Sequence, residues 1–325
     1  MDSLAARLRT EFDEFAKAPN FFIVGAPKCA TTTLAASLAN HPDVFVSSLK
    51  EPHVFGSDLP DRHVRRLMEL PTYAALFHAV ESESAVGEGS VWYLRSTRAA
   101  EEIHEFNASA RIIVMLRNPV DMLYSLHGEF LRAGVEDIRD FRSALAAEAD
   151  RRKGDRIRPG VVNHGQLLYS DAVAYSSQVQ RFLDSFGARA VHVVLFDDVL
   201  SSPQLVITRV QDFLEVDIEA DLGLPRQNEG RVVRSPRLQH FARQQGRLRS
   251  VVHRVVPANA RHRLSRLVRQ TVERVNIERT APPRMSSQLR AELTERFSPE
   301  VSQLESVIQR DLTPWKTVDP GLGDD

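Results

Sequence analysis

The chain has 325 residues, of which 42% are hydrophobic, so it is long enough to bury a substantial core. Lysine and arginine number 42 against 43 aspartate and glutamate, which gives a formal charge of −1 and leaves only local patches to attract an anionic partner. Cys29 is the single cysteine, the first residues lack the apolar core of a secretory signal, and no uncharged apolar stretch reaches the roughly 18 residues of a spanning helix. We therefore expect a cytoplasmic protein, with peripheral membrane contact as an alternative.

The apolar pattern predicts strands that alternate with helices. An N-terminal helix is expected to end at Ala18, before Pro19. Four strands are predicted at 21–24, 44–46, 112–116 and 191–196, and further helices at 34–40, 172–186 and 203–214. This alternation is typical of an α/β fold with a doubly wound, mainly parallel sheet.

Two regions are predicted from the composition. Residues 19–230 are expected to form the α/β domain, and residues 231–325 a helical C-terminal region packed on the same domain. Between Arg231 and Val272 there are eleven arginines and no acidic residue. These arginines are expected to be solvated or paired with acidic surface, with contact to an anionic membrane or substrate as the alternatives. Nucleic acid is not an expected partner, because aromatic residues for stacking are nearly absent there.

The segment G-A-P-K-C-A-T-T-T (25–33) lies between a predicted strand and a predicted helix. Free backbone N–H groups and the helix dipole make such a junction an anion-binding site. Relative to the nucleotide-binding pattern G-x-x-x-x-G-K-[ST], the second glycine is Ala30 and the lysine has moved into the loop, to Lys28. The sequence therefore predicts a P-loop-like phosphate-binding loop, in which Lys28 and three threonine hydroxyls contact the phosphate oxygens.

Two other uses of this loop conflict with the sequence. A cysteine phosphatase needs an arginine six positions after its nucleophile, and Ala35 stands there. Cys29 is therefore expected to be a small packing residue, although a helix N-terminus would lower its pKa. A kinase usually has an Mg²⁺-binding aspartate at the end of a neighbouring strand, whereas Arg117 follows the strand at 112–116. A metal-free anion site is favoured.

Three motifs, in chain order, resemble those of the sulfotransferases that use 3′-phosphoadenosine 5′-phosphosulfate (PAPS), in particular the heparan-type and bacterial branch. The loop at 25–34 is similar to the family's 5′-phosphosulfate loop. K-E-P-H-V-F (50–55) resembles the stretch in which heparan-type enzymes place a glutamate base. R-I-I-V-M-L-R-N-P-V-D-M-L-Y-S (111–125) is similar to the strand and helix that bind the donor's 3′-phosphate. The tail at 297–315 resembles the C-terminal helix and closing Asp-Leu-x-x-Trp of bacterial members.

The resemblance implies sulfuryl transfer from PAPS to a hydroxyl or amine of an acceptor such as a carbohydrate, a lipid or a secondary metabolite. Its product would be 3′,5′-adenosine diphosphate, and no metal is expected. Lys28 and Glu51 are the implied catalytic residues, at the bridging oxygen and the acceptor proton respectively. The implied donor-binding residues are Lys28, Cys29, Ala30, Thr31, Thr32, Thr33, Arg117, Ser125, Arg231 and Arg234. The candidate acceptor-side residues are His53, Ser90, Trp92 and Tyr93, with core packing as the alternative for each.

The sequence departs from the family pattern near the site. Heparan-type enzymes place a lysine within Gly-Glu-Lys-Ser/Thr, and this chain has Gly89 at that position. Two other functions stay open. One is a P-loop kinase that uses ATP and Mg²⁺, and the other is a non-catalytic nucleotide-binding protein at a membrane surface.

Overall fold

The computed structural model describes residues 3–12, 17–59, 70–158, 161, 164–219, 222–224, 232–233, 277–278 and 285–318. Contacts divide the chain into two compact units. Unit 1 is made of Met1–Met122, Tyr169–Gln227 and Arg290–Asp325, and unit 2 of Leu123–Leu168 and Asn228–Leu289. The C-terminal residues Arg290–Asp325 belong to the first unit. There the backbone N–H of Ser176 donates to Glu300 Oε1 at 2.6 Å.

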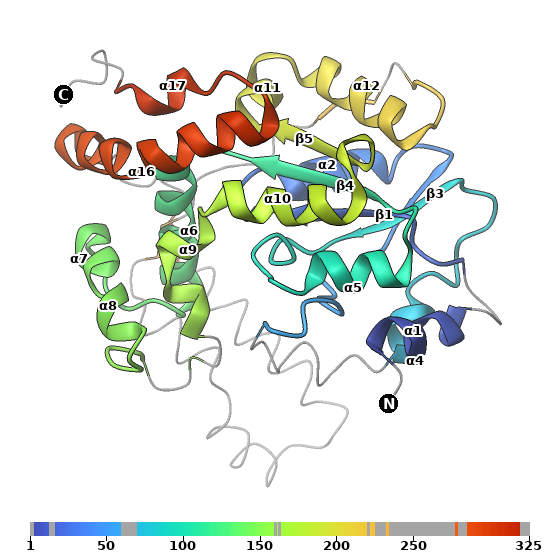
Figure 1. Ribbon diagram of the computed structural model, residues 1–325, viewed down its shortest axis with the longest axis horizontal. Helices are drawn as coiled ribbons and strands as arrows, with labels where there is room; N and C mark the ends of the chain where they lie inside the picture. The colour runs from blue at the N-terminus through green and yellow to red at the C-terminus, as the bar shows by residue number, and fades with distance from the viewer. Residues whose placement is uncertain are drawn as a thin grey trace, which may run out of the picture. The chain divides into compact units, whose positions relative to one another are not determined.

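Five parallel strands form the centre of unit 1, in the order β2-β3-β1-β4-β5 (Figure 1). They are β1 (Phe21–Gly25), β2 (Val44–Val46), β3 (Ala85–Gly89), β4 (Arg111–Leu116) and β5 (Val191–Leu195). The four strands predicted from apolar runs are present, and the predicted parallel α/β sheet is confirmed. β3 was not predicted, because its sequence A-V-G-E-G has two glycines and a charge, which are rare in strands.

Helices cover both faces of this sheet. Figure 1 shows α5 and α10 in front of the strands and α2 behind them. The helices of unit 1 are α1 (Leu4–Phe12), α2 (Thr31–Leu38), α4 (Leu70–Ala75), α5 (Ala99–Phe106), α9 (Tyr169–Ala172), α10 (Tyr175–Phe186), α11 (Phe196–Ser201), α12 (Pro203–Leu214), most of α16 (Ser287–Ile308) and α17 (Thr313–Lys316). The predicted helices at 34–40, 172–186 and 203–214 correspond to α2, α10 and α12. Phe196, predicted as a strand residue, instead begins α11.

An aromatic cluster fills part of the core of unit 1. The rings of Phe55, Tyr73 and Phe106 are buried, and the centroids of Phe55 and Phe106 lie 5.5 Å apart. Each buried ring removes a large apolar area from water, which is the main favourable term in folding. The cluster fixes the segment that contains Phe55, just after the predicted glutamate base.

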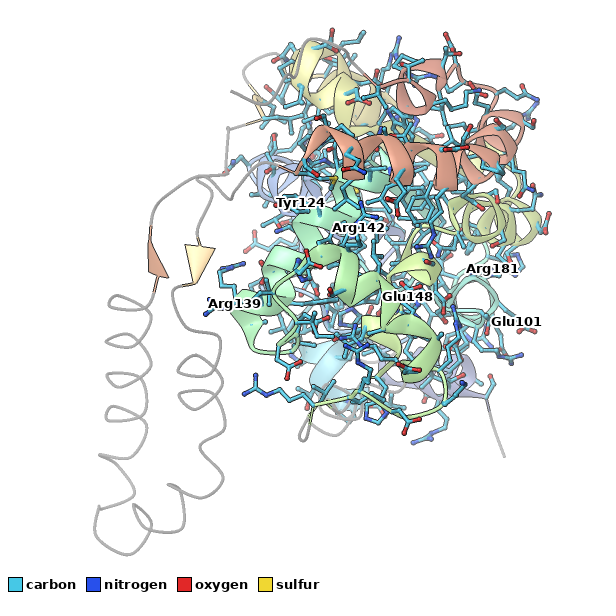
Figure 2. The ribbon with its side chains drawn as sticks, turned by 90° about the vertical axis from the view of Figure 1, so that its left-hand side faces the viewer. Glu101, Tyr124, Arg139, Arg142, Glu148 and Arg181 are labelled. Atoms are coloured by element: carbon cyan, nitrogen blue, oxygen red, sulfur yellow. The ribbon has the colours of Figure 1, made fainter. Side chains whose placement is uncertain are left out.

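Unit 2 contains the helices α7 (Phe141–Ala146) and α8 (Glu148–Arg151), the 3₁₀ turn His164–Leu167 and the antiparallel pair β6 (Val232–Val233) and β7 (Ile277–Glu278). α6 (Pro119–Ala133) begins in unit 1 and supplies its residues from Leu123 onward to unit 2. Figure 2 shows these helices with Tyr124 on α6, Arg142 on α7 and Glu148 on α8. Inside the unit, Arg151 forms a 2.8 Å ion pair with Glu136, with both side chains buried.

Of the residues predicted at the C-terminal side of the site, Arg231 and Arg234 lie outside the described residues. So does the basic stretch 231–272, apart from the two residues of β6. In the part of the chain that the structure describes, no helix combines the length and the apolar character needed to cross a membrane.

Candidate active site

The segments that follow β1, β3 and β4 meet at one edge of the sheet. The backbone N–H of Ser90, just after β3, donates to the carbonyl of Ile23 at 3.0 Å. The N–H of Ala26, just after β1, donates to the carbonyl of Met115 in β4 at 2.6 Å. Because the three strands are parallel, all three segments lie at their carboxyl ends, where open α/β sheets bind ligands. The predicted donor and acceptor motifs are therefore at a common edge.

The loop between β1 and α2 has the backbone of an anion site. Lys28 and Ala30 have φ angles of 63° and 67°, in the left-handed region, and Thr31 begins α2 directly afterwards. Alternating backbone conformations of this kind turn successive N–H groups toward one side, and the free N–H groups of the helix N-terminus add to them. Thr31 and Thr33 are buried and Thr32 is exposed. The loop geometry suits a phosphate, as the sequence predicts.

Gly25 is required where the loop leaves β1. Its φ of 154° lies in the region that side chains rarely adopt, and a Cβ there would lie 2.7 Å from Leu94 Cβ and 2.8 Å from the carbonyl oxygen of Val91. The segment after β3 therefore packs directly on the loop, which fixes the start of the anion site.

Arg117 brings a guanidinium to this loop. It follows β4, and its Nη1 donates to the carbonyl of Lys28 at 3.4 Å. The guanidinium carbon lies 4.5 Å from the ring centroid of Phe196, which is a cation–π geometry. The predicted phosphate loop and the predicted 3′-phosphate arginine are thus neighbours. Ser125, the other predicted 3′-phosphate residue, is half-buried on α6 and belongs to unit 2.

Cys29 is buried within the loop, which confirms that its side chain packs. The expectation of a lowered pKa is wrong, because burial raises the pKa of the thiol to about 12 and outweighs the attraction of Arg117 and Lys28 for the thiolate. The hydroxyl of Tyr175 from α10 lies beside both Cys29 and Arg117. Cys29 can therefore contribute to an anion site only through its backbone N–H.

Glu51 follows β2 in the chain and lies in space beside the carboxyl end of β3. Its backbone N–H donates to the carbonyl of Gly89 at 3.1 Å, and its side chain is 27% exposed. Lys50 Nζ is 3.3 Å from Glu51 Oε1, and His53 Nε2 is 3.9 Å from Oε2. A carboxylate with solvent access at the end of β3, the strand next to β1, can take a proton from an acceptor. His53 is buried, with its ring edge against Tyr93 at 5.9 Å between centroids, which matches its packing alternative.

A buried carboxylate that the sequence reasoning left without a role lies beneath these residues. Glu88 has no exposed surface and accepts hydrogen bonds from the hydroxyls of Ser90 at 2.6 Å, Tyr93 at 2.8 Å and Tyr73 at 3.2 Å. Burial raises the pKa of Glu88 to about 7. Its signal in the sequence was a single charge within a small, apolar run, where a carboxylate needs partners.

The candidate acceptor-side residues after Glu88 occupy different environments. Ser90 and Tyr93 are fully buried, and their hydroxyls contact Glu88. Trp92 between them is half-buried. The core-packing alternative therefore describes Ser90 and Tyr93, while Trp92 retains some exposed surface. Among the described residues, no group of three or more His, Cys, Asp or Glu side chains is arranged to hold a metal ion.

The doubly wound parallel sheet, with its phosphate-type loop after β1, places the protein in the P-loop-like α/β class. A family model described as "Sulfotransferase domain" matches residues 18–234, so the chain belongs to the sulfotransferase family. The crystal structure of a sulfotransferase from Alicyclobacillus acidocaldarius superimposes with a TM-score of 0.67 at 29% sequence identity, covering 93% of this chain and 100% of that one.

Curated relatives carry the same family name. Mouse "Carbohydrate sulfotransferase 15" is 35% identical over 238 residues, which are 60% of this chain and 40% of that protein. The human protein of that name is 35% identical over 147 residues, covering 33% of this chain and 26% of the relative. The chain thus spans well under half the length of these mammalian relatives.

Proposed function

We propose that the chain transfers a sulfuryl group from PAPS to a hydroxyl group of a carbohydrate-type acceptor. The observation that carries the proposal is the contact between the phosphate-type loop and Arg117, whose Nη1 lies 3.4 Å from the Lys28 carbonyl. Two neighbouring anion-binding groups suit a donor with a 5′-phosphosulfate and a 3′-phosphate. Membership of the sulfotransferase family supports the donor, and the relatives named as carbohydrate sulfotransferases support the acceptor class.

On the donor side, the loop binds the group that leaves. The N–H groups of Cys29 to Thr33 and the threonine hydroxyls would hold the 5′-phosphate, and Lys28 the oxygen that bridges it to sulfur. Negative charge grows on that oxygen as its bond to sulfur breaks, so a fixed cation there lowers the barrier. Arg117 would hold the 3′-phosphate and set the position of the donor along the sheet edge, while the same role for Ser125 stays a prediction from the sequence.

On the acceptor side, Glu51 would act as the general base. The acceptor oxygen forms a bond to sulfur while its proton passes to the Glu51 carboxylate, and the bond between sulfur and the 5′-phosphate oxygen breaks. The products are the sulfated acceptor and 3′,5′-adenosine diphosphate. The hydrogen bond from Glu51 N–H to Gly89 O at 3.1 Å supports this role, since it ties the base to the strand beside β1.

Calorimetric titration with 3′,5′-adenosine diphosphate, without metal, tests the donor. We expect binding in the micromolar range by the wild type and affinity about 100-fold weaker for Lys28→Ala, because a charge-assisted contact to phosphate is lost. Lys50→Ala, at an exposed lysine beside Glu51, is the matched control and should bind as the wild type does. Binding of ATP with Mg²⁺ in place of the diphosphate would refute the donor assignment and favour a P-loop kinase.

A second experiment tests the acceptor class. Radiolabelled PAPS is offered with the methyl glycosides of glucose, galactose and N-acetylgalactosamine, and with a long-chain alcohol as a lipid-like acceptor. Label transferred to a glycoside supports the proposal, and transfer to the alcohol alone refutes the carbohydrate class. Tight diphosphate binding with no transfer to any acceptor would favour the non-catalytic alternative. A cytoplasmic location and peripheral contact of 231–272 with an anionic membrane stay predictions.

A further inference from the structure

We propose that Glu88 is a positioning residue for the acceptor-activating segment 51–55: through the hydroxyls of Ser90 and Tyr93, its carboxylate fixes the backbone that contains Glu51. This inference rests on the proposed role of Glu51 as base, and goes beyond it by naming what holds that base in place.

Two short chains of hydrogen bonds connect Glu88 to the segment. The hydroxyl of Ser90 donates to Glu88 Oε2 at 2.6 Å and accepts from the backbone N–H of His53 at 3.1 Å. The hydroxyl of Tyr93 donates to Glu88 Oε1 at 2.8 Å and accepts from the N–H groups of Val54 at 2.9 Å and Phe55 at 3.3 Å. All these partners are buried, so water does not compete for the bonds.

The segment needs such support because it has no regular structure of its own. It forms neither helix nor strand, and Glu51 and His53 have φ angles of 58° and 49°. Side chains other than glycine adopt this left-handed region only when the surroundings hold them there. Three successive N–H groups donating to two fixed hydroxyls supply that constraint.

The direction of the bonds depends on the charge of Glu88. An ionised carboxylate only accepts, so each hydroxyl directs its one proton to Glu88 and keeps its lone pairs for the backbone N–H groups. A neutral Glu88 carries a proton of its own, and one hydroxyl has to turn to accept it. The groups that face Glu88 are Tyr73 from α4, Ser90 and Tyr93 after β3, and Glu51, whose charge adds to the burial that raises the pKa of Glu88 to about 7.

Matched variants separate positioning from general packing. Tyr93→Phe and Ser90→Ala each remove a donor to Glu88 together with an acceptor for the segment. Tyr73→Phe also removes a donor to Glu88 Oε1, but it leaves in place the hydroxyls of Ser90 and Tyr93 that accept from the segment. The measurement is amide hydrogen exchange of residues 53–55 in the full chain. Exchange should be about 10-fold faster in Tyr93→Phe and Ser90→Ala, and unchanged in Tyr73→Phe.

Catalysis and pH supply two further readouts. With PAPS and methyl β-galactoside as the acceptor probe, kcat should fall about 10-fold in Tyr93→Phe while the KM for PAPS stays within about 2-fold. Burial raises the pKa of Glu88 from its ordinary 4.5 to about 7, so the closed state holds the proton more tightly than an opened state in which Glu88 meets water. Protection of 53–55 in the wild type, corrected for intrinsic exchange, should therefore fall as pH increases from about 4.5 to about 7, and Glu88→Gln should abolish this fall.

Equal effects in the three hydroxyl variants, or protection in Glu88→Gln that still falls with pH as in the wild type, would overturn the proposal. The exchange experiment needs neither donor nor acceptor. A wild type that fails to bind 3′,5′-adenosine diphosphate would therefore remove the proposed function and leave the role of Glu88 in holding the segment to be judged by exchange alone.

Discussion

At the residue scale, Cys29 shows how burial decides the chemistry of a loop residue. A thiol beside two cations and a helix N-terminus is the usual setting of a reactive cysteine. Here the side chain has no exposed surface, and the cost of burying a thiolate exceeds the attraction of Arg117 and Lys28. In the phosphate loop, the Cys29 side chain therefore packs as a small apolar group.

Cys29 should consequently resist alkylation in the folded protein. Its pKa lies near 12, above the ordinary value, so the thiol stays protonated as pH rises through the range in which exposed cysteines ionise. We expect reaction with iodoacetamide at about pH 8 to be more than about 100-fold slower than in the urea-unfolded chain. The measurement is mass-spectrometric labelling over time. Rapid labelling of the folded protein, at the rate of the unfolded chain, would show that the thiol is ionised or exposed.

Glu88 marks a limit of prediction from sequence. Lys28, Glu51 and Arg117 were predicted from motifs, because each lies in a short run of residues that resembles a family pattern. Glu88 was not assigned a role, because Tyr73 of α4 reaches it only in the folded chain, and because the hydroxyls of Ser90 and Tyr93 turn back to it only there. Spacing along a chain does not report such a contact, and neither does it report the desolvation that shifts the pKa values of Cys29 and Glu88.

At the element scale, β3 is held against β1 by a glycine. A Cβ on Gly87 would lie 2.5 Å from the carbonyl oxygen of Phe21 and 2.6 Å from its ring, so the side chain of Phe21 occupies the space that a larger residue would need. Two positions later, a Cβ on Gly89 would meet Ile23 at 3.6 Å, which is ordinary contact. Gly87 and Gly89, which kept β3 from being predicted as a strand, therefore differ in whether a side chain would fit.

Gly87→Ala and Gly89→Ala form a matched pair in one strand. We expect Gly87→Ala to lower the free energy of unfolding by more than about 2 kcal/mol, because the new methyl group overlaps backbone and ring atoms. Gly89→Ala should change it by less than about 1 kcal/mol, since alanine fits there and restricts the unfolded chain. Urea denaturation of both variants beside the wild type measures the difference. Similar losses at the two positions would contradict the packing described for β3.

The elements themselves were predictable to different degrees. Runs such as Ile112–Leu116 are apolar because both faces of a parallel strand are covered, and this pattern identifies them. The division of the chain into units was not predictable from composition. It depends on side-chain contacts of α16, such as Glu300 with Ser176, that join residues more than a hundred positions apart.

At the scale of the whole molecule, the C-terminal segment of unit 1 returns to the edge of the sheet beside the donor site. The indole N–H of Trp315 donates to Asp197 Oδ2 at 2.5 Å, and the carbonyl of Trp315 accepts from Asn118 Nδ2 at 3.5 Å. Asp197 and Asn118 adjoin Phe196 and Arg117, which form the cation–π pair. Trp315, in the C-terminal Asp-Leu-x-x-Trp sequence, therefore bonds to the residues that follow Phe196 and Arg117 and helps to hold this pair in place.

Variants of two neighbouring aspartates of α11, Asp197 and Asp198, test whether Trp315 holds the pair in place. Asp197 pairs with the buried Trp315, whereas Asp198 pairs with the partly exposed Arg310 at 3.1 Å. Both stand in the first turn of the helix, so replacing either one removes a similar interaction with its dipole. We expect Asp197→Ala to lower the free energy of unfolding by about 2 kcal/mol, because the indole N–H loses its partner, and Asp198→Ala by less than about 1 kcal/mol.

The two variants should also differ in donor binding. Loosening the turn at Phe196 lets the Arg117 guanidinium leave the phosphate loop, so Asp197→Ala should bind 3′,5′-adenosine diphosphate about 5-fold more weakly, and Asp198→Ala as the wild type does. Calorimetry with the diphosphate and urea denaturation give the two numbers for each variant. Equal affinities in both variants, together with the expected loss of stability in Asp197→Ala, would mean that the C-terminal segment stabilises unit 1 without holding Arg117. A loss of affinity confined to Asp197→Ala would extend the donor site to a residue that lies almost two hundred positions after Arg117, at Trp315.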